Sequence, residues 1–159
     1  MPTSAERNAM IADLRALPGQ LEALVSGLSE AQLTTHYLPD EWTVAQNIHH
    51  LADSHMVSFT RMKLILTEDN PTLKSYSQDG WAALPDATHT RLSESITLLR
   101  ALHTRWATLF ESLTEEQWAR TGVRDDGRVS SLDDVLRIYS NHGKSHMDQI
   151  RKTLAAAPK

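Results

Sequence analysis

Apolar residues recur every three or four positions along four stretches of the chain, the spacing that places them on one face of an α-helix. These stretches predict helices over Ser4–Val25, Thr43–Glu68, Leu92–Leu113 and Ser131–Ala156. No segment shows the strict alternation of apolar and polar residues that is typical of a half-buried strand. The pattern therefore predicts an all-α four-helix bundle, built as a single domain over residues 1–159.

Capping boxes mark where helices begin. In this motif a Ser or Thr and a Glu or Gln three residues later bond to each other's backbone N–H. The pairs are Thr43 with Gln46, Ser29 with Gln32, and Thr114 with Gln117. The first pair opens a long helix, and the other two predict short extra helical turns. Pro18 is expected to kink or reset the first helix, because proline lacks the backbone N–H.

A long connection, Asp69–Thr90, separates the second and third predicted helices. Its Asn-Pro and Leu-Pro pairs favour turns over a continuous helix. It also carries two large aromatic residues, Tyr76 and Trp81. Because so long a connection in a small domain is often a functional loop, these two residues are candidates for a lid over a pocket. Simple packing of the loop is the alternative.

The composition narrows the class of protein. The formal net charge is -4 and basic residues are scattered, so the basic patch expected of a nucleic-acid-binding protein is missing. No run approaches the roughly 20 apolar residues of a membrane span, and the first residues do not resemble a secretory signal. A cytoplasmic protein that binds neither nucleic acid nor membrane is expected. Because the chain has 0 cysteines and 8 histidines, histidine and carboxylate are its candidate metal ligands.

His142 and His146 are spaced four residues apart, so their imidazoles project from one face of the last predicted helix. Two nitrogen ligands of one metal ion require this geometry. Gly143 lies between them and would permit the close approach of a neighbouring helix or a ligand. The alternative is a pair of core-edge histidines bonded to backbone or water.

Three further histidines lie in the second predicted helix. His55 sits in the apolar stripe, which favours a core or interface position, and His49 points away from both faces. His50 has polar neighbours on its own face, including Asn47 and Asp53. That face is either a solvated surface or one wall of a polar pocket, and periodicity leaves both open.

The stretches 42–55 (WTVAQNIHHLADSH), 64–72 (LILTEDNPT) and 142–150 (HGKSHMDQI) resemble the DinB superfamily, and specifically its YfiT-like branch. The resemblance covers nearly the whole chain. It implies a four-helix bundle that holds a divalent metal ion, usually Zn²⁺ or Ni²⁺. Carried over by position, the implied ligands are His50, His142 and His146, and His49 is excluded.

The implied chemistry follows from an open site, because three imidazoles leave coordination positions free for water or substrate. Members of the branch are described as metal-dependent hydrolases, and relatives in the superfamily use small thiols such as bacillithiol, mycothiol or glutathione. We expect transfer of a small thiol to an electrophile. Hydrolysis by a metal-activated water is the alternative, and a non-catalytic metal- or ligand-binding stress protein is a further one.

Other polar residues are candidates for the pocket around the metal. Asp53, one turn beyond His50, either orients an imidazole or acts as a general base, or is an ordinary exposed carboxylate. The candidates for a small-molecule pocket are Asn47, Arg61, Tyr76, Trp81 and Gln149. Structural ion pairs or hydrogen bonds would equally account for Arg61 and Gln149.

A homodimer is expected as well. Bundle helices with apolar residues to spare, such as those around His55 and Phe59, can pack against a second copy, and the sequence does not fix which face is used. The resemblance points the same way.

Overall fold

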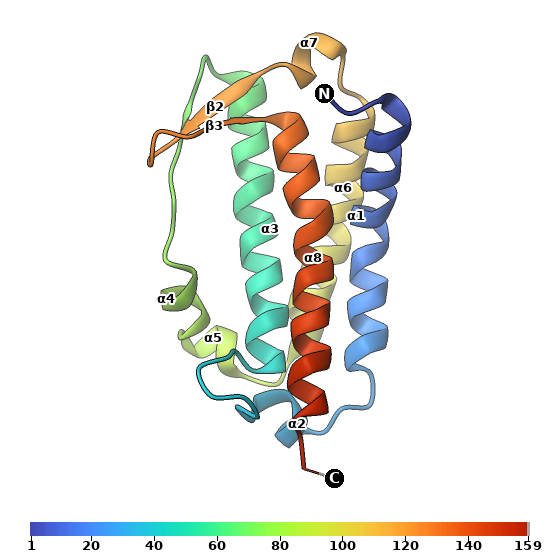
Figure 1. The fold of residues 1–159 in the computed structure, drawn as a ribbon, viewed down its shortest axis with the longest axis vertical. Coiled ribbons are helices and arrows are strands. Elements are labelled where there is room, and N and C mark those ends of the chain that lie inside the picture. The colour runs from blue at the N-terminus through green and yellow to red at the C-terminus, as the bar shows by residue number, and fades with distance from the viewer. Residues whose placement is uncertain (159) are drawn as a thin grey trace.

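The computed structural model describes residues 1–158 and confirms the helical bundle (Figure 1). Its four long helices are α1 (Ser4–Val25), α3 (Val44–Thr67), α6 (Leu92–Glu111) and α8 (Leu132–Ala155). The predicted bounds agree with these to within two residues at each end. The periodic apolar pattern therefore located every long helix.

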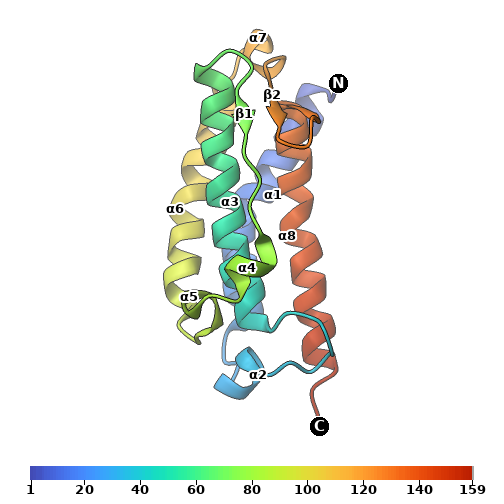
Figure 2. The same cartoon turned by 90° about the vertical axis from the view of Figure 1, so that its left-hand side faces the viewer.

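The four helices pack in a cyclic order in which α1 and α3 each contact both α6 and α8. Helices α3 and α6 run in the same direction, and α1 and α8 run in the opposite one (Figures 1 and 2). The connection between α3 and α6 must therefore return along the length of the bundle, beside α3 (Figure 2). This return segment explains why the connection is so long.

The capping boxes form as the sequence predicts. Thr43 accepts from the backbone N–H of Gln46, whose side chain accepts from the backbone N–H of Thr43. The other two predicted pairs open the short helices α2 (Glu30–Thr34) and α7 (Glu115–Trp118). Helix α1 is continuous through Pro18 and is not reset there.

A small sheet at one end of the bundle corrects the prediction that the chain has no strands. It consists of β1 (Thr72–Leu73), β2 (Thr121–Arg124) and β3 (Val129–Ser131). Strand β2 pairs in parallel with β1 and antiparallel with β3. Strands of two to four residues are too short to show an alternating pattern, and the β1–β2 pair joins distant parts of the chain.

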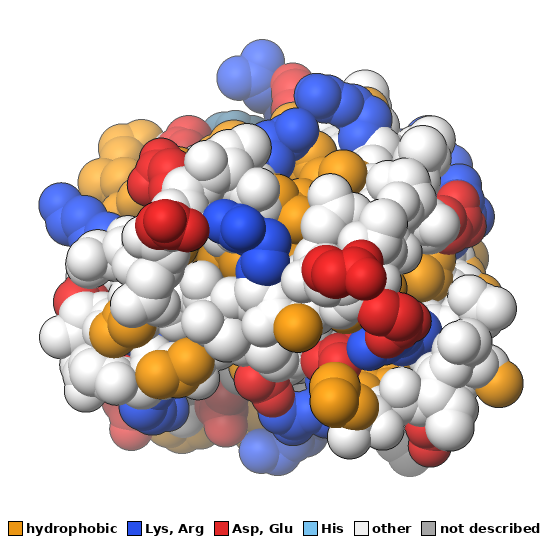
Figure 3. Space-filling model, turned by 90° about the horizontal axis from the view of Figure 1, so that it is seen from above, with side chains coloured by type: hydrophobic (Ala, Val, Ile, Leu, Met, Phe, Trp, Pro, Cys, Tyr) orange, Lys and Arg blue, Asp and Glu red, His pale blue; other side chains and the backbone are white. Residues whose placement is uncertain are grey.

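The connection before α6 also contains two helical turns, α4 (Gln78–Ala82) and α5 (Pro85–Thr88). Both lie at the end of the bundle opposite the sheet (Figure 1). Figure 3 views the sheet end and shows acidic and basic side chains interspersed, without a face of one charge. Among residues 1–158, no helix is long and apolar enough to cross a membrane.

The hydrophobic core is divided into two clusters along the bundle. One is built around Trp106 and Phe110 near the sheet, and the other around Leu21 and Ile48 near the opposite end. His55 is 0% exposed and Phe59 is 8% exposed, both inside this core. The dimer contact expected around them is therefore wrong, because the chain's own helices already cover that face. The homodimer itself stays a prediction.

Candidate metal centre

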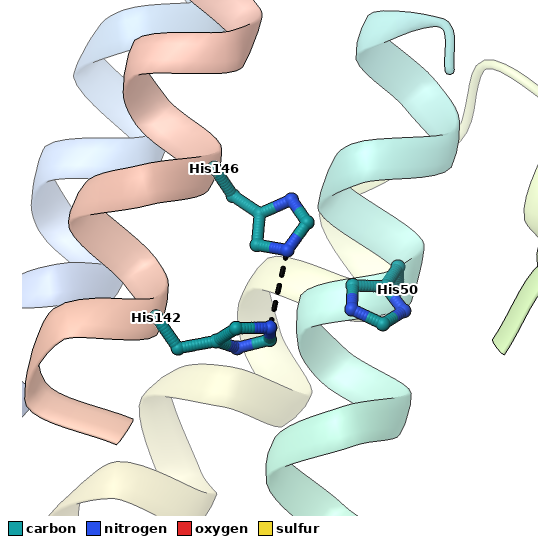
Figure 4. Close-up of side chains that lie close together, drawn as sticks. All are labelled: His50, His142 and His146. Atoms are coloured by element: carbon teal, nitrogen blue, oxygen red, sulfur yellow. Dashed lines mark hydrogen bonds between the residues drawn. The ribbon is translucent and has the colours of Figure 1, made fainter. Parts of the chain in front are cut away.

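Three histidine side chains meet between α3 and α8 (Figure 4). His50 comes from α3, and His142 and His146 come from successive turns of α8. Their ring centroids lie 4.5 to 5.3 Å apart. One ring nitrogen of each lies within 4.8 Å of the others. The helix packing thus brings together the three residues that the family resemblance implied as ligands.

His146 is oriented by an amide on the facing helix. Its Nδ1 lies 2.7 Å from Asn47 Oδ1, and the Asn47 amide donates to the backbone carbonyl of Thr43 at 2.9 Å. Because that bond uses the NH₂ group of Asn47, the amide oxygen faces His146 and accepts from its Nδ1–H. The proton-free nitrogen of a neutral His146 is therefore Nε2, which points toward His142.

All three rings are neutral at pH 7. Burial lowers the pKa of His146 to about 4, and burial together with the charges of neighbouring histidines lowers the pKa of His50 to about 4 and of His142 to about 3. A neutral imidazole offers one lone pair to a metal ion. The centre therefore presents nitrogen donors without needing to release protons first.

The donor set fits a divalent metal ion. The Nε2 atom of His50 is buried and has no hydrogen-bond partner. The Nε2 atoms of His142 and His146 lie 3.1 Å apart. Two nitrogens that each bind Zn²⁺ at 2.0–2.1 Å are roughly 2.8–3.4 Å apart, for bond angles between 90° and the tetrahedral angle. A close pair of nitrogen lone pairs beside an unpartnered third nitrogen is the arrangement that a cation stabilises.

A cavity of about 250 Å³ opens beside His146. Its other lining residues are Asp40, Glu41, Trp42, Gln78, Asp79 and Gln149. The Trp42 ring lies 4.6 Å from that of His50 and stacks at 6.1 Å on that of His146, measured between centroids. The predicted pocket residue Gln149 lies here and donates to Glu41 at 2.6 Å. This cavity provides space for a small molecule next to one ligand.

The structure places Asp53 away from the three rings. Its carboxylate lines a different cavity, of about 220 Å³, with His49 and Asp86. Burial, and then the charge of Asp86, raises the pKa of Asp53 to about 6. The structure gives no hydrogen bond between Asp53 and His50. A role for Asp53 as an orienting group or base stays a prediction.

Of the remaining pocket candidates, Tyr76 and Trp81 lie in the return segment and Arg61 lies beside it. Arg61 donates to the backbone carbonyl of Lys74, which ties α3 to that segment. The rings of Tyr76 and Trp81 pack on each other with centroids 4.4 Å apart. Tyr76 is half-buried, and burial raises its pKa. Roles in substrate binding for these three side chains stay predictions.

Both ring nitrogens of His49 form hydrogen bonds to groups outside the metal centre. Its Nδ1 lies 2.8 Å from Ser95 Oγ, and its Nε2 lies 3.1 Å from the carbonyl oxygen of His89. These contacts join α3 to the end of α5 and to the first turn of α6. His49 is thus a structural histidine, while its neighbour His50 faces α8.

Sequence reasoning missed several residues around the centre. Trp42 precedes the helix cap, in a stretch without periodicity, and Glu41 contacts Gln149 only through the packing of the loop against α8. His103 was not singled out, because a lone histidine in an apolar helix carries no spacing signal. A tryptophan beside a histidine-rich helix is the one signal that would have marked Trp42.

Gly143 permits a close approach between α8 and α1. A Cβ atom there would lie 2.3 Å from Leu17 Cδ2 and 2.5 Å from Leu17 Cδ1. Leu17 is 4% exposed and has little room to move. The predicted role of Gly143 in close helix packing is confirmed.

Gly143→Ala is therefore expected to lower the free energy of unfolding by about 1–3 kcal/mol, the usual cost of overpacking a core. Helix propensity alone would favour alanine by about 1 kcal/mol. Gly19→Ala in α1 is the matched control, because a Cβ there meets nothing within 4 Å. Urea denaturation of the metal-free proteins measures both. Equal or greater stability of Gly143→Ala would contradict the packing argument.

The chain matches a known family over most of its length. The sequence profile of the DinB superfamily matches residues 13–150. A protein of Halalkalibacterium halodurans named "Putative metal-dependent hydrolase" is 40% identical over 144 residues, which are 91% of this chain and 84% of that protein. A protein of Geobacillus kaustophilus with the same description is 44% identical over 142 residues, 88% of this chain and 79% of its own.

Solved structures show the same architecture. YfiT from Bacillus subtilis, described as "a probable metal-dependent hydrolase with an unusual four-helix bundle topology", matches with a TM-score of 0.93 and 34% identity. The match covers 96% of this chain and 88% of YfiT. The mycothiol-dependent maleylpyruvate isomerase shares the fold, with a TM-score of 0.70 and 17% identity over 94% of this chain and 61% of its own. The bundle topology, the converging histidines and the family match agree, and this chain belongs to the DinB superfamily.

Proposed function

We propose that the protein is a divalent-metal-dependent enzyme that transfers a small thiol to an electrophile. His50, His142 and His146 would hold the ion, with Zn²⁺ or Ni²⁺ the best match to imidazole donors. A divalent ion there supplies Lewis acidity, which lowers the pKa of a water molecule or thiol at its open positions.

The observation that carries the choice of a thiol is that the side chains in direct contact with the three rings are neutral, while the carboxylates of Asp40, Glu41 and Asp79 line the cavity beside His146. The neighbours of the rings are Asn47, Trp42, His55 and Tyr139, and none of these is a carboxylate. A thiol ionises near pH 8.5, whereas water has a pKa near 15.7. A thiol nucleophile therefore needs much less help from a general base than water does. The chain has no cysteine, so the sulfur must come from a cosubstrate.

The chain's own residues would bind and orient the reactants. Asn47 holds the His146 ring in one tautomer, and Trp42 covers His50 and His146 on the cavity side. The cavity of about 250 Å³ beside His146 has room for a small cosubstrate. Glu41 and Gln149, which bond to each other, offer polar groups at its wall. Asp79 adds a carboxylate suited to an amino group on the thiol or the electrophile.

Hydrolysis is the second candidate, because the relatives at 40% and 44% identity bear the name of metal-dependent hydrolase. In that reaction a carboxylate would have to accept the proton from water. Asp40, Glu41 and Asp79 of the cavity, and Asp53 as the sequence suggests, are the candidates for this role. The two reactions differ in whether a thiol is consumed.

Turnover assays separate the two candidates. The protein loaded with Zn²⁺ or Ni²⁺ is incubated with 1-chloro-2,4-dinitrobenzene and bacillithiol, mycothiol or glutathione, and in parallel with activated esters without thiol. We expect thioether formation with at least one thiol, and loss of that activity in His146→Ala. Ester cleavage without thiol would favour the hydrolase. Equal activity of wild type and His146→Ala would contradict a metal-dependent enzyme.

A further inference from the structure

Two buried histidines beyond the metal centre have no part in the proposed chemistry. His55 on α3 is 0% exposed and His103 on α6 is 1% exposed. They lie in the bundle between the two hydrophobic clusters. Burying two imidazoles in a core is unfavourable unless their nitrogens are bonded, so their partners decide what they do.

The chain of bonds begins at a backbone carbonyl. His103 Nδ1 lies 2.6 Å from the carbonyl oxygen of Leu14 in α1. In a regular helix this carbonyl would accept from the N–H of residue 18, but residue 18 is Pro18 and has no N–H. The proline therefore leaves the Leu14 carbonyl free for His103.

The carbonyl sets the direction of every bond that follows. A carbonyl oxygen only accepts, so His103 Nδ1 carries a hydrogen and donates it. Burial lowers the pKa of His103 to about 4, so the ring is neutral and its Nε2 is a bare acceptor. The Nδ1 of His55 lies 2.8 Å from that Nε2 and must donate to it.

The same argument assigns the donor and the acceptor of the next hydrogen bond, between His55 and the metal ligand His142. His55 is wholly buried and the single N–H of its neutral ring, at Nδ1, is used for the bond to His103, so its Nε2 accepts. That Nε2 lies 3.1 Å from Nδ1 of His142. His142 therefore donates its Nδ1–H to His55, and its Nε2 is free of a proton. This is the nitrogen that faces His146 at 3.1 Å.

We propose that the Leu14 carbonyl, His103 and His55 form a hydrogen-bonded relay that holds His142 in the Nδ1–H tautomer and presents its Nε2 to the metal ion. His55 and His103 are positioning residues, since they act through His142. The relay takes one group from each long helix, so the orientation of one ligand depends on the packing of the whole bundle. The inference rests on the metal site of the proposed function and deepens it.

Nitrogen NMR of the metal-free protein tests the relay directly. The ¹⁵N shifts of the assigned His142 ring show which nitrogen carries the proton. We expect protonated Nδ1 and bare Nε2 in the wild type. A wild-type His142 protonated at Nε2 would overturn the relay. This measurement needs neither metal nor turnover, so it can succeed even if the proposed reaction is wrong.

Variants of His55 test the consequence for metal binding. His55→Leu removes the acceptor, so we expect both tautomers of His142 and Zn²⁺ affinity lower by about 10–100-fold, the usual effect of losing an orienting partner. His55→Gln keeps an acceptor and is expected to retain most of the affinity. His49→Leu is the control, because His49 is a buried, hydrogen-bonded histidine of the same helix that lies outside the relay. It should change neither the tautomer of His142 nor the affinity for Zn²⁺.

Two results from these variants would overturn the proposal. One is unchanged Zn²⁺ affinity in a folded His55→Leu protein. The other is an equal loss of affinity in His55→Leu and His49→Leu, which would indicate a general packing effect. If His55→Leu does not fold, the tautomer of His142 in the wild-type spectrum still decides the matter.

Discussion

Replacing His50 with alanine is expected to weaken binding of Zn²⁺ or Ni²⁺ by more than about 100-fold. His50 would supply the only ligand from α3, and its buried Nε2 has no hydrogen-bond partner. Loss of an orienting partner of a metal ligand already costs about 10–100-fold, so loss of the ligand itself should cost more. Competition with a chromophoric chelator at pH 7 measures the change.

His49→Ala provides the comparison for this experiment. His49 is the adjacent residue and is also buried, but its nitrogens contact Ser95 and the His89 carbonyl. Its removal should leave the metal affinity within a few-fold of the wild type. Circular dichroism of both variants is the check that each one folds. Weak binding by His49→Ala together with normal binding by His50→Ala would reverse the assignment of the ligand.

Arg7→Met is expected to lower the free energy of unfolding by about 3–5 kcal/mol, the cost of breaking a buried ion pair from one side. Arg7 is 5% exposed and forms two parallel bonds to Asp133, Nε to Oδ1 at 2.7 Å and Nη2 to Oδ2 at 2.9 Å. Its guanidinium also bonds to Glu115 and lies 4.3 Å from the centre of the Trp118 ring. Without Arg7, Asp133 is a buried carboxylate without its cation.

Arg15→Met on the same helix is the matched control. Arg15 pairs with Glu111 at 2.8 Å, but both side chains are nearly half exposed, at 44% and 49%. An exposed pair contributes only about 0–1 kcal/mol, so this variant should unfold at nearly the wild-type denaturant concentration. Guanidinium titrations would contradict the role of Arg7 if the two variants differed by less than about 1 kcal/mol. Asp133→Leu added to Arg7→Met should recover part of the loss.

Local sequence patterns were sufficient to predict the four long helices and the short helices α2 and α7, but not the helical turns α4 and α5. The apolar period and the capping boxes act within a few residues, and each places a helix start or a buried face without reference to the rest of the chain. Thr43 with Gln46 is the clearest example, since both reciprocal bonds form as predicted. The spacing of His142 and His146 is local in the same sense, because four residues make about one helical turn.

Long-range packing decided what these patterns left open. The small sheet pairs β1 with β2, which are far apart in the sequence, and no local signal marks strands so short. His50 lay on a polar face that was either a surface or a pocket wall, and the contact of α3 with α8 made it a wall. Resemblance to a family suggested that pairing, but only the fold shows which nitrogens meet.

The histidines of the bundle best illustrate the difference between what local sequence patterns determine and what long-range packing decides. The sequence alone determined that His142 and His146 share one helix face and that His55 lies in an apolar stripe. The tertiary structure decided that His55 bonds to both His142 and His103, and that Pro18 leaves the Leu14 carbonyl free to anchor them. The physical reason is that helix periodicity is a property of neighbouring residues, whereas hydrogen bonds between helices depend on how all four pack together.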